Sequence, residues 1–318
     1  MSLPLDRRSF LALAAAGWAH AEEQFTRPVV SEDACPVEPI APVARDGHRG
    51  QGFLRKPPGA GPFPAILWVH GGLVTRPADG IRDNAVRLPN AMRFLAAGYV
   101  TAIITYRSRD HDPQSTVSLA DCLAAVEHLR RLPYVDPKSI VVYGCSGGGD
   151  LALEVAAATE VCAIVPEEPA SLLLTGIFNA KFPKKGERFT PADAAPISEN
   201  PKHYYTPECQ KLTRAKLARI RCPILIVQGD QHPINRFNAE VLIPELRAAG
   251  KTLEVITYPG EPHCFGFQGA RRSAAVAKAF RDADAFCRRY LATQPKTLES
   301  GLVKSMPLAG LPMACCRA

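Results

Sequence analysis

The sequence lacks several patterns that would place it in a familiar class. Its ten cysteines include no Cys-x-x-Cys pair and no cysteine–histidine spacing suited to zinc. Its basic residues give a net charge of +7, but they form no long run interleaved with aromatic side chains, so nucleic-acid binding is not indicated. It has no blade-like repeats and no apolar stretch long enough to span a membrane. With 47% hydrophobic residues, it has the composition of a globular protein with a sizeable core.

The first 21 residues have the features of an export signal. Arg7 and Arg8 precede a short apolar stretch at residues 11–18, and a small-x-small cleavage site ends at Ala21. The paired arginines followed by Ser-Phe-Leu resemble a twin-arginine signal, which carries folded proteins. The alternative is a chance pair at the start of an ordinary helix. We expect the mature chain to be soluble and to act in the periplasm or outside the cell.

An oxidising destination permits disulfides, but spacing alone does not give their pairing. Cys122, Cys162 and Cys287 lie within apolar strand or helix patterns. We expect these three side chains to be free thiols.

Apolar strand patterns alternate with amphipathic helix patterns along most of the chain. The run at 65–69 is apolar at every position, which is typical of a strand buried on both faces in a parallel sheet. The alternation predicts an α/β fold with a doubly wound, mostly parallel sheet and helices on both faces. Predicted strands lie at 51–55, 65–69, 100–106, 139–143, 161–165, 224–227 and 253–258, and predicted helices at 85–97, 118–132, 150–158, 238–249 and 274–291.

We expect one domain over residues 22–292. Residues 167–220 interrupt the alternation of strand and helix patterns with scattered prolines, lysines and aromatic residues. A segment of this length usually has structure of its own or forms a lid, so it is predicted to be a cap insertion. Residues 293–318 are expected to form a poorly packed C-terminal tail. Ligands of such sheets bind beyond the carboxyl ends of the strands.

The segment Gly144-Cys145-Ser146-Gly147-Gly148 lies between a predicted strand and a predicted helix. A Gly-x-Ser-x-Gly turn in that context exposes the serine oxygen above the sheet, and its glycines avoid clashes in the tight bend. Ser146 is therefore the predicted nucleophile. A glycine-rich turn with a purely structural role is the alternative.

A general base and oxyanion donors are also present. His263 follows the last predicted strand and precedes the final helix, and no other of the eight histidines is so placed. Its imidazole suits proton transfer near neutral pH. Gly71 and Gly72 follow the strand at 65–69. They and the backbone N–H of Gly147 are the predicted donors to the oxyanion.

These motifs resemble the α/β-hydrolase superfamily, most closely its esterase, dienelactone-hydrolase and prolyl-oligopeptidase branch. The resemblance covers residues 62–292. It rests on residues 66–72, on the Tyr-Val-Asp-Pro at 134–137 that leads to the elbow, and on the Tyr-Pro-Gly-x-x-His-x-Phe at 258–265. It implies an α/β-hydrolase fold with the chain order serine, acid, histidine.

The position of the acid departs from the pattern of that branch, which usually has Gly-x-x-Asp after the seventh strand. Residues 229–232 read Gly-Asp-Gln-His, so His232 occupies the usual place and Asp230 comes two residues early. Asp230 is the preferred acid, and His232 is interpreted as a surface residue rather than a substrate contact. The alternatives are Glu168 and its neighbour Glu167, after the strand at 161–165. Some related hydrolases hold the acid there, including glucuronoyl esterases, which share Gly-Cys-Ser at the elbow.

The predicted function is hydrolysis of a carboxylic ester through an acyl-enzyme intermediate, without cofactor or metal. Residues 110–112, Asp-His-Asp, lie in a turn-like stretch and are not interpreted as metal ligands. An exported enzyme of this kind would act on a small-molecule or saccharide-linked ester. The alternatives are a serine peptidase of the prolyl-oligopeptidase type and a non-catalytic binding protein on the same scaffold.

Overall fold

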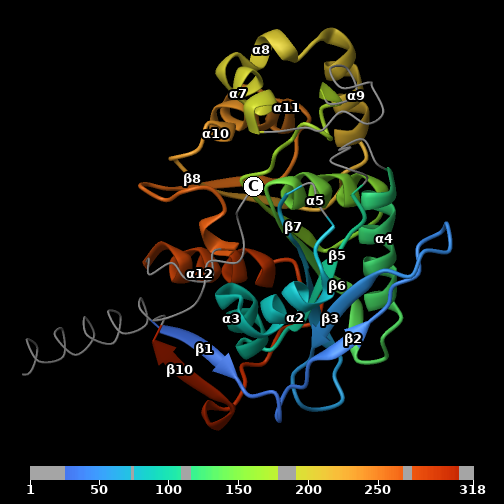
Figure 1. The fold of residues 1–318 in the computed structure, drawn as a ribbon, viewed down its shortest axis with the longest axis vertical. Helices are drawn as coiled ribbons and strands as arrows, with labels where there is room; N and C mark the ends of the chain where they lie inside the picture. Colours follow the sequence, from blue (N-terminus) through green and yellow to red (C-terminus); the bar gives the residue numbers. More distant parts are fainter. Residues whose placement is uncertain (1–25, 73–74, 109–115, 178–190, 268–273, 308–318) are drawn as a thin grey trace, which may run out of the picture.

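The computed structural model describes residues 26–72, 75–108, 116–177, 191–267 and 274–307 (Figure 1). Within these ranges the central sheet has eight strands in the order β2-β3-β5-β4-β6-β7-β8-β9. β3 is antiparallel to both of its neighbours, and the strands from β5 to β9 are parallel to one another. The strands are β2 (Glu38–Ile40), β3 (Gln51–Arg55), β4 (Phe63–Val69), β5 (Val100–Thr105), β6 (Val135–Cys145), β7 (Ala163–Glu167), β8 (Ile224–Gly229) and β9 (Leu253–Tyr258).

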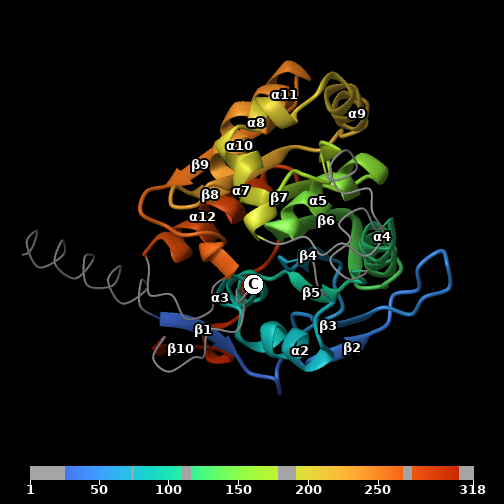
Figure 2. The ribbon, with the colours of Figure 1, turned by 45° about the horizontal axis from the view of Figure 1, so that its top comes forward.

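Helices cover both faces of this sheet (Figure 2). Because successive side chains of a strand point to opposite faces, Ile66 and Trp68 of β4 enter one apolar core and Leu67 and Val69 enter the other. The predicted α/β architecture is confirmed. The first core contains α2 (Ala78–Arg87), α3 (Pro89–Ala96) and α12 (Ala274–Arg288), and the second contains α4 (Thr116–Arg130), α5 (Gly147–Ala158) and α11 (Ile243–Ala248). No helix in the described ranges is long and apolar enough to cross a membrane.

Pro89 divides the helical segment that precedes β5. The residue before it, Leu88, has an extended backbone and ends α2, while Pro89 starts α3. A proline disfavours the helical conformation of the residue before it and fits the first turn of a new helix. The helix predicted over 85–97 is therefore two helices, and the first begins earlier, at Ala78.

The two ends of the described chain pair with each other. β1 (Thr26–Val30) and β10 (Val303–Pro307) form a separate antiparallel pair (Figure 1). Thr293 is also anchored, because its Oγ1 donates to Asp136 Oδ2 at 2.7 Å and its N–H donates to Ser139 Oγ at 2.9 Å. Residues 293–307 thus differ from the poorly packed tail we expected. The predicted export signal at 1–21 lies outside the described residues.

The described part of the predicted cap is helical. It contains α7 (Pro191–Glu199), α8 (Pro201–Tyr204) and α9 (Pro207–Leu217), and it packs against α10 (Ile234–Phe237) and a π-helical turn, η1 (Asn238–Leu242). These helices gather at the end of the molecule opposite β1 and β10 (Figures 1 and 2). They share a small apolar core of Leu172, Ile177, Ile197, Cys209, Phe237 and Val241. The cap is therefore completed by residues that follow β8. Two 3₁₀ turns complete the fold, η2 (Phe265–Phe267) and η3 (Ser300–Leu302).

The eight cysteines of the described ranges are free thiols. Cys122 and Cys287 are buried, as the apolar patterns around them indicated, whereas Cys162 is partly exposed. Burial raises the pKa of each of these three thiols. We therefore expect them to be protonated and unreactive at neutral pH.

Candidate active site

Ser146 lies at the tight turn between β6 and α5. Its backbone has φ 53° and ψ −117°, a left-handed conformation that non-glycine residues rarely adopt. Its N–H donates to the carbonyl of Glu167 at 2.9 Å, which ties the turn to the end of β7. A Cβ at Gly144 would lie 2.0 Å from the carbonyl oxygen of Gly148, so the turn requires glycine there. The structure therefore gives the predicted nucleophile the elbow geometry expected from its sequence.

His263 lies after β9 at the same end of the sheet. Its Nδ1 is 2.9 Å from Glu168 Oε2, and its side chain is 22% exposed whereas that of Glu168 is fully buried. The thiols of Cys264 and Cys145 form a hydrogen bond. This contact joins the residue after His263 to the residue before Ser146. The predicted base and the predicted nucleophile therefore belong to one site.

Glu168 is held by donors from three parts of the chain. Its Oε1 accepts from the N–H of Gly229 at 3.0 Å and from Asn235 Nδ2 at 2.8 Å, and its Oε2 also accepts from the N–H of Cys264. Burial raises the pKa of Glu168, but the hydrogen bonds from His263, Asn235 and Cys264 outweigh burial and leave its pKa below the ordinary value. At neutral pH this carboxylate is ionised and oriented toward the imidazole.

Asp230, the preferred acid from the sequence, faces a different part of the chain. It is exposed, and its Oδ1 accepts from the N–H of Gly260 at 2.9 Å and from Gln231 Nε2 at 2.5 Å. It comes one residue after β8, and its carboxylate is used to hold the turn that follows β9. The structure therefore brings Glu168, the alternative from the sequence, to His263 and leaves Asp230 in solvent.

Glu167 is also fully buried, but its carboxylate is bound by other groups. It accepts from Tyr143 Oη at 3.0 Å and from the N–H of Gly266 at 2.7 Å. β7 ends at Glu167, and Glu168 has a positive φ of 43°, so the two neighbouring carboxylates have different partners. Glu167 anchors the segment after His263, and Glu168 contacts His263 itself.

The described ranges contain four non-glycine residues with positive φ, and all are near this site. They are Ser146, Glu168, Ser171 and Cys264, with φ of 53°, 43°, 60° and 54°. Backbone strain of this kind is typical of functional sites. Here it affects the predicted nucleophile, the carboxylate at His263 and the residue next to His263.

The predicted oxyanion donors lie beside Ser146. A Cβ added at Gly71 would come within 3.2 Å of Ser146 Cβ, so the glycine turn packs closely against the serine. Gly147 is the first residue of α5, and the N–H groups of a first helical turn have no partner within the helix. Gly71 and Gly147 therefore both lie next to Ser146.

Tyr106 holds the glycine turn at residues 70–72 in place. Its hydroxyl donates its one proton to the carbonyl oxygen of Gly72 at 2.6 Å, and the carbonyl oxygen of His70 lies 3.0 Å from the same hydroxyl. Gly72 has φ 86°, a left-handed conformation that glycine adopts without strain. The sequence analysis did not identify Tyr106, although it directly follows β5 and so lies at the carboxyl end of the sheet.

His70 is buried and neutral. Its ring stacks on Tyr106 with centroids 4.3 Å apart, and its Nδ1 donates to the carbonyl oxygen of Gly71 at 2.9 Å. Burial lowers its pKa from 6.5 to about 3. A proton added at Nε2 would be buried without an acceptor among the described residues. Folding therefore opposes protonation of His70.

This burial predicts a pH dependence of stability. Between pH 6.5 and about 3 the unfolded chain binds a proton at His70 that the folded chain does not, so the free energy of unfolding decreases as the pH falls. At full effect the slope is about 1.4 kcal/mol per pH unit. When the pH is lowered from 6.5 to 5, we expect the free energy of unfolding of His70→Asn to fall by about 1–2 kcal/mol less than that of the parent. Urea unfolding at the two pH values measures this difference.

The comparison between parent and variant removes the contribution of Asp150. Burial raises the pKa of Asp150 to about 7, so this residue stabilises the folded state as the pH falls, opposite to His70. It is present in both proteins and cancels in the difference. If the free energy of unfolding of the parent and that of His70→Asn depended equally on pH, the conclusion that folding opposes protonation of His70 would be wrong.

One group of described residues has ligand atoms close enough to share a metal ion, namely Glu168, His263 and Cys264. Glu168 Oε2 already faces His263 Nδ1. Burial raises the pKa of the Cys264 thiol well above its usual range, so this thiol stays protonated and is a poor ligand. The group suits proton transfer better than metal binding. Residues 110–112 lie outside the described ranges.

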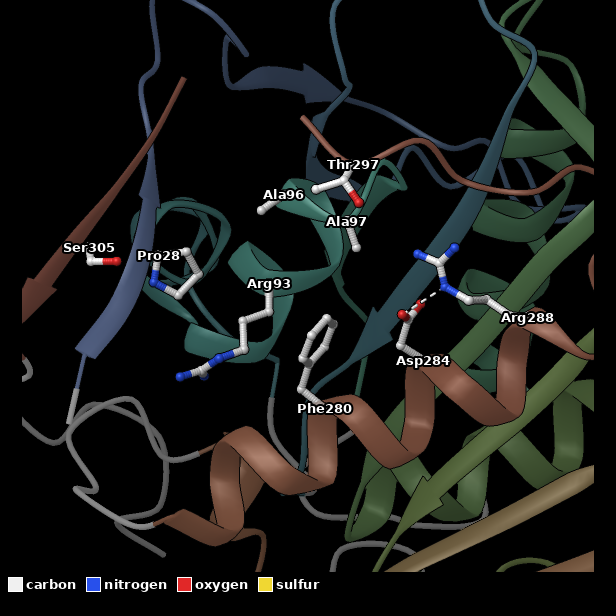
Figure 3. A pocket seen from close by; sticks show the side chains of 9 residues that line it. All are labelled: Pro28, Arg93, Ala96, Ala97, Phe280, Asp284, Arg288, Thr297 and Ser305. Atoms are coloured by element: carbon white, nitrogen blue, oxygen red, sulfur yellow. Dashed lines mark hydrogen bonds and ion pairs between the residues drawn. The ribbon is translucent and has the colours of Figure 1, made fainter. Parts of the chain in front are cut away.

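A separate pocket of about 350 Å³ lies at the other end of the molecule, between β1, β10, α3 and α12 (Figure 3). Inside it, Arg288 Nε pairs with Asp284 Oδ2 at 2.8 Å. The pocket is lined by Pro28, Arg93, Ala96, Ala97, Phe280, Asp284, Arg288, Thr297 and Ser305. These residues do not come from the carboxyl ends of β6, β7 or β8, so the pocket is distinct from the site at Ser146.

The model of the prolyl oligopeptidase family matches residues 85–294. This range includes Ser146, Glu168 and His263, together with the strands and helices that hold them.

Solved structures with the same fold include esterases and a peptidase. Esterase Est22 is 14% identical, with a TM-score of 0.58 over 89% of this chain and 88% of its own. A Pyrobaculum calidifontis esterase is 19% identical, with a TM-score of 0.58 over 89% and 92%. A Mycobacterium tuberculosis puromycin-hydrolyzing peptidase is 18% identical, with a TM-score of 0.59 over 83% of this chain and 40% of its own. At these identities the likeness establishes the fold, and the predicted α/β-hydrolase fold is confirmed.

Proposed function

The chain belongs to the prolyl oligopeptidase family, and on that basis we propose that it is a serine hydrolase that cleaves a carboxylic ester through an acyl-enzyme intermediate. The observation that carries the proposal is the 2.9 Å contact between His263 Nδ1 and Glu168 Oε2, in the site where Ser146 occupies a strained turn. A serine, a histidine and a buried carboxylate in this relation form the machinery of acyl transfer.

Each residue has a role in the proposed reaction. Ser146 Oγ attacks the ester carbonyl as His263 Nε2 takes its proton, and the N–H groups of the glycine turn and of Gly147 stabilise the oxyanion. Glu168 holds the Nδ1–H and stabilises the imidazolium. His263 then gives its proton to the leaving alcohol. Water attacks the acyl-enzyme with the help of the same base, and the acid is released.

A peptidase using the same residues is the second candidate. The family to which the chain belongs and one of its structural neighbours are named for peptide or puromycin hydrolysis. The other two neighbours described above are esterases. The ester proposal therefore has support from the solved structures that match most of their own length, whereas the peptidase neighbour is matched over 40% of its length.

The test compares two chromogenic substrates with the same acyl part, a p-nitrophenyl ester and a peptide p-nitroanilide. We expect the purified protein to hydrolyse the ester and to leave the anilide essentially uncleaved. Protein pretreated with a fluorophosphonate, which blocks the nucleophilic serine, is the control and should be inactive. Comparable cleavage of both substrates would favour a peptidase. Absence of both activities together with absence of labelling would favour a binding protein.

We also propose that the enzyme is exported and acts on an external ester, such as an acylated sugar or a plant-derived ester. The support comes from the sequence, where Arg7 and Arg8, the apolar stretch 11–18 and the small residues around Ala21 have the order of a twin-arginine signal.

A further inference from the structure

A second imidazole lies against the face of His263. The rings of His232 and His263 are stacked, with centroids 4.0 Å apart and an interplanar angle of 21°. His232 comes from the turn between β8 and α10 and is partly buried. The sequence analysis interpreted it as a surface residue, but its ring is part of the site.

The orientation of the His232 ring is fixed by the start of α10. The N–H of Ile234 donates to His232 Nδ1 at 3.2 Å. Because Nδ1 acts as the acceptor, the proton of the neutral ring is on Nε2. Ile234 is itself buried, so the donor that sets this ring is anchored in the fold.

The ring also stays uncharged at neutral pH. Burial, and next the nearby His263, lower the pKa of His232 from 6.5 to about 4, with Glu168 acting in the opposite direction. An uncharged ring does not repel the imidazolium that forms on His263 during acyl transfer. Its π-face can attract that cation.

The two contacts of His263 restrict different motions. Glu168 Oε2 lies 2.9 Å from Nδ1 at one edge of the ring, and a single contact at one edge leaves the ring free to rock about that contact. The stacked ring of His232 blocks this rocking on one side. Together they restrict both the position of the ring and its tilt, and the tilt decides where Nε2 points.

We propose that His232 is a positioning residue that supports the face of His263 and keeps its Nε2 directed at Ser146. This inference rests on the proposed function, because it assigns His263 the role of general base. It predicts that removal of the His232 ring slows the chemical step and leaves substrate binding unchanged.

The test uses His232→Ala and His232→Phe with a small p-nitrophenyl ester. We expect His232→Ala to lower kcat about ten- to hundredfold with KM unchanged, since small misplacements of a catalytic group cost this much. Phenylalanine restores a flat ring without the nitrogens, so His232→Phe should recover most of kcat. His203→Ala, at an exposed histidine of the cap, is the matched control, and thermal unfolding identifies variants that fail to fold.

Three results would overturn the proposal. A kcat of His232→Ala equal to that of the parent would show that the ring is not needed. Equal losses in His232→Ala and His232→Phe would show that stacking is not the cause. A rise in KM without a fall in kcat would make His232 a substrate contact.

A measurement independent of turnover separates this proposal from the function on which it rests. The Nδ1 proton of His263, bound to Glu168, can be followed by NMR in the downfield region. Broadening of this resonance in His232→Ala supports positioning, and an unchanged resonance refutes it. Failure of the parent to hydrolyse any ester or to react with a fluorophosphonate would refute the proposed function, and the comparison of resonances would still decide the role of His232.

Discussion

Replacement of Ser146 by alanine is expected to lower kcat for a p-nitrophenyl ester by about a millionfold, which is the usual cost of removing the nucleophile of such a site. The hydroxyl at the elbow is the atom that would form the acyl-enzyme, and neither His263 nor the oxyanion donors can replace it. The variant should also lose labelling by a fluorophosphonate. Both are measured on purified protein, with kcat followed by release of nitrophenol.

Ser31→Ala is the matched control, because Ser31 is exposed and, among the described residues, its hydroxyl bonds only to its near neighbour Asp33. It should keep the kcat and the labelling of the parent. Full hydrolysis by Ser146→Ala would place the nucleophile elsewhere. Full biological activity without hydrolysis by either protein would instead support a binding role.

Replacement of Glu168 by glutamine is expected to lower kcat by about ten-thousandfold, while Asp230→Asn should change it by no more than about threefold. Glutamine keeps the shape of the side chain but removes the charge that stabilises the imidazolium, and its amide can favour the wrong tautomer of His263. Asp230 binds the N–H of Gly260 and lies in solvent, so its charge is not available to the imidazole.

The two variants control for each other, because each removes one negative charge next to the carboxyl end of a neighbouring strand. Kinetics with the p-nitrophenyl ester give kcat, and thermal unfolding shows whether Glu168→Gln, which alters a buried residue, is still folded. A large loss in Asp230→Asn with a small loss in Glu168→Gln would reverse the assignment and restore the acid preferred from the sequence.

The sheet could be predicted from the sequence because its strands are continuous apolar runs separated by amphipathic helices. Residues 65–69 are buried on both faces, and a pattern of this kind depends only on local composition. The pairing of β1 with β10 could not be predicted. It joins residues 26–30 to residues 303–307, which are far apart in the sequence, and neither segment has a local feature that specifies its partner. The cap helices α7, α8 and α9 each begin at a proline and have little periodicity.

From the sequence, the carboxylate that contacts His263 could be limited to a few candidates, but the right one could not be identified. Asp230 and Glu168 each come directly after a parallel strand, and β7 and β8 are neighbours, so sequence position places both near His263. The difference arises from the backbone. Glu168 adopts φ 43°, and the N–H groups of Gly229 and Cys264, which come much later in the chain, meet its carboxylate. Contacts of this kind depend on three separated segments and have no local signature.

The cluster of left-handed residues around the nucleophile has a consequence for how this protein can evolve. Each of the conformations at Ser146, Glu168, Ser171 and Cys264 costs about 1–3 kcal/mol, against a net stability of about 5–15 kcal/mol for a typical domain. Mutations that relax these turns would increase the free energy of unfolding, but they would also move the side chains of the proposed active site apart. Selection for robustness alone would therefore erode the site, and its persistence requires continued selection for what the site does.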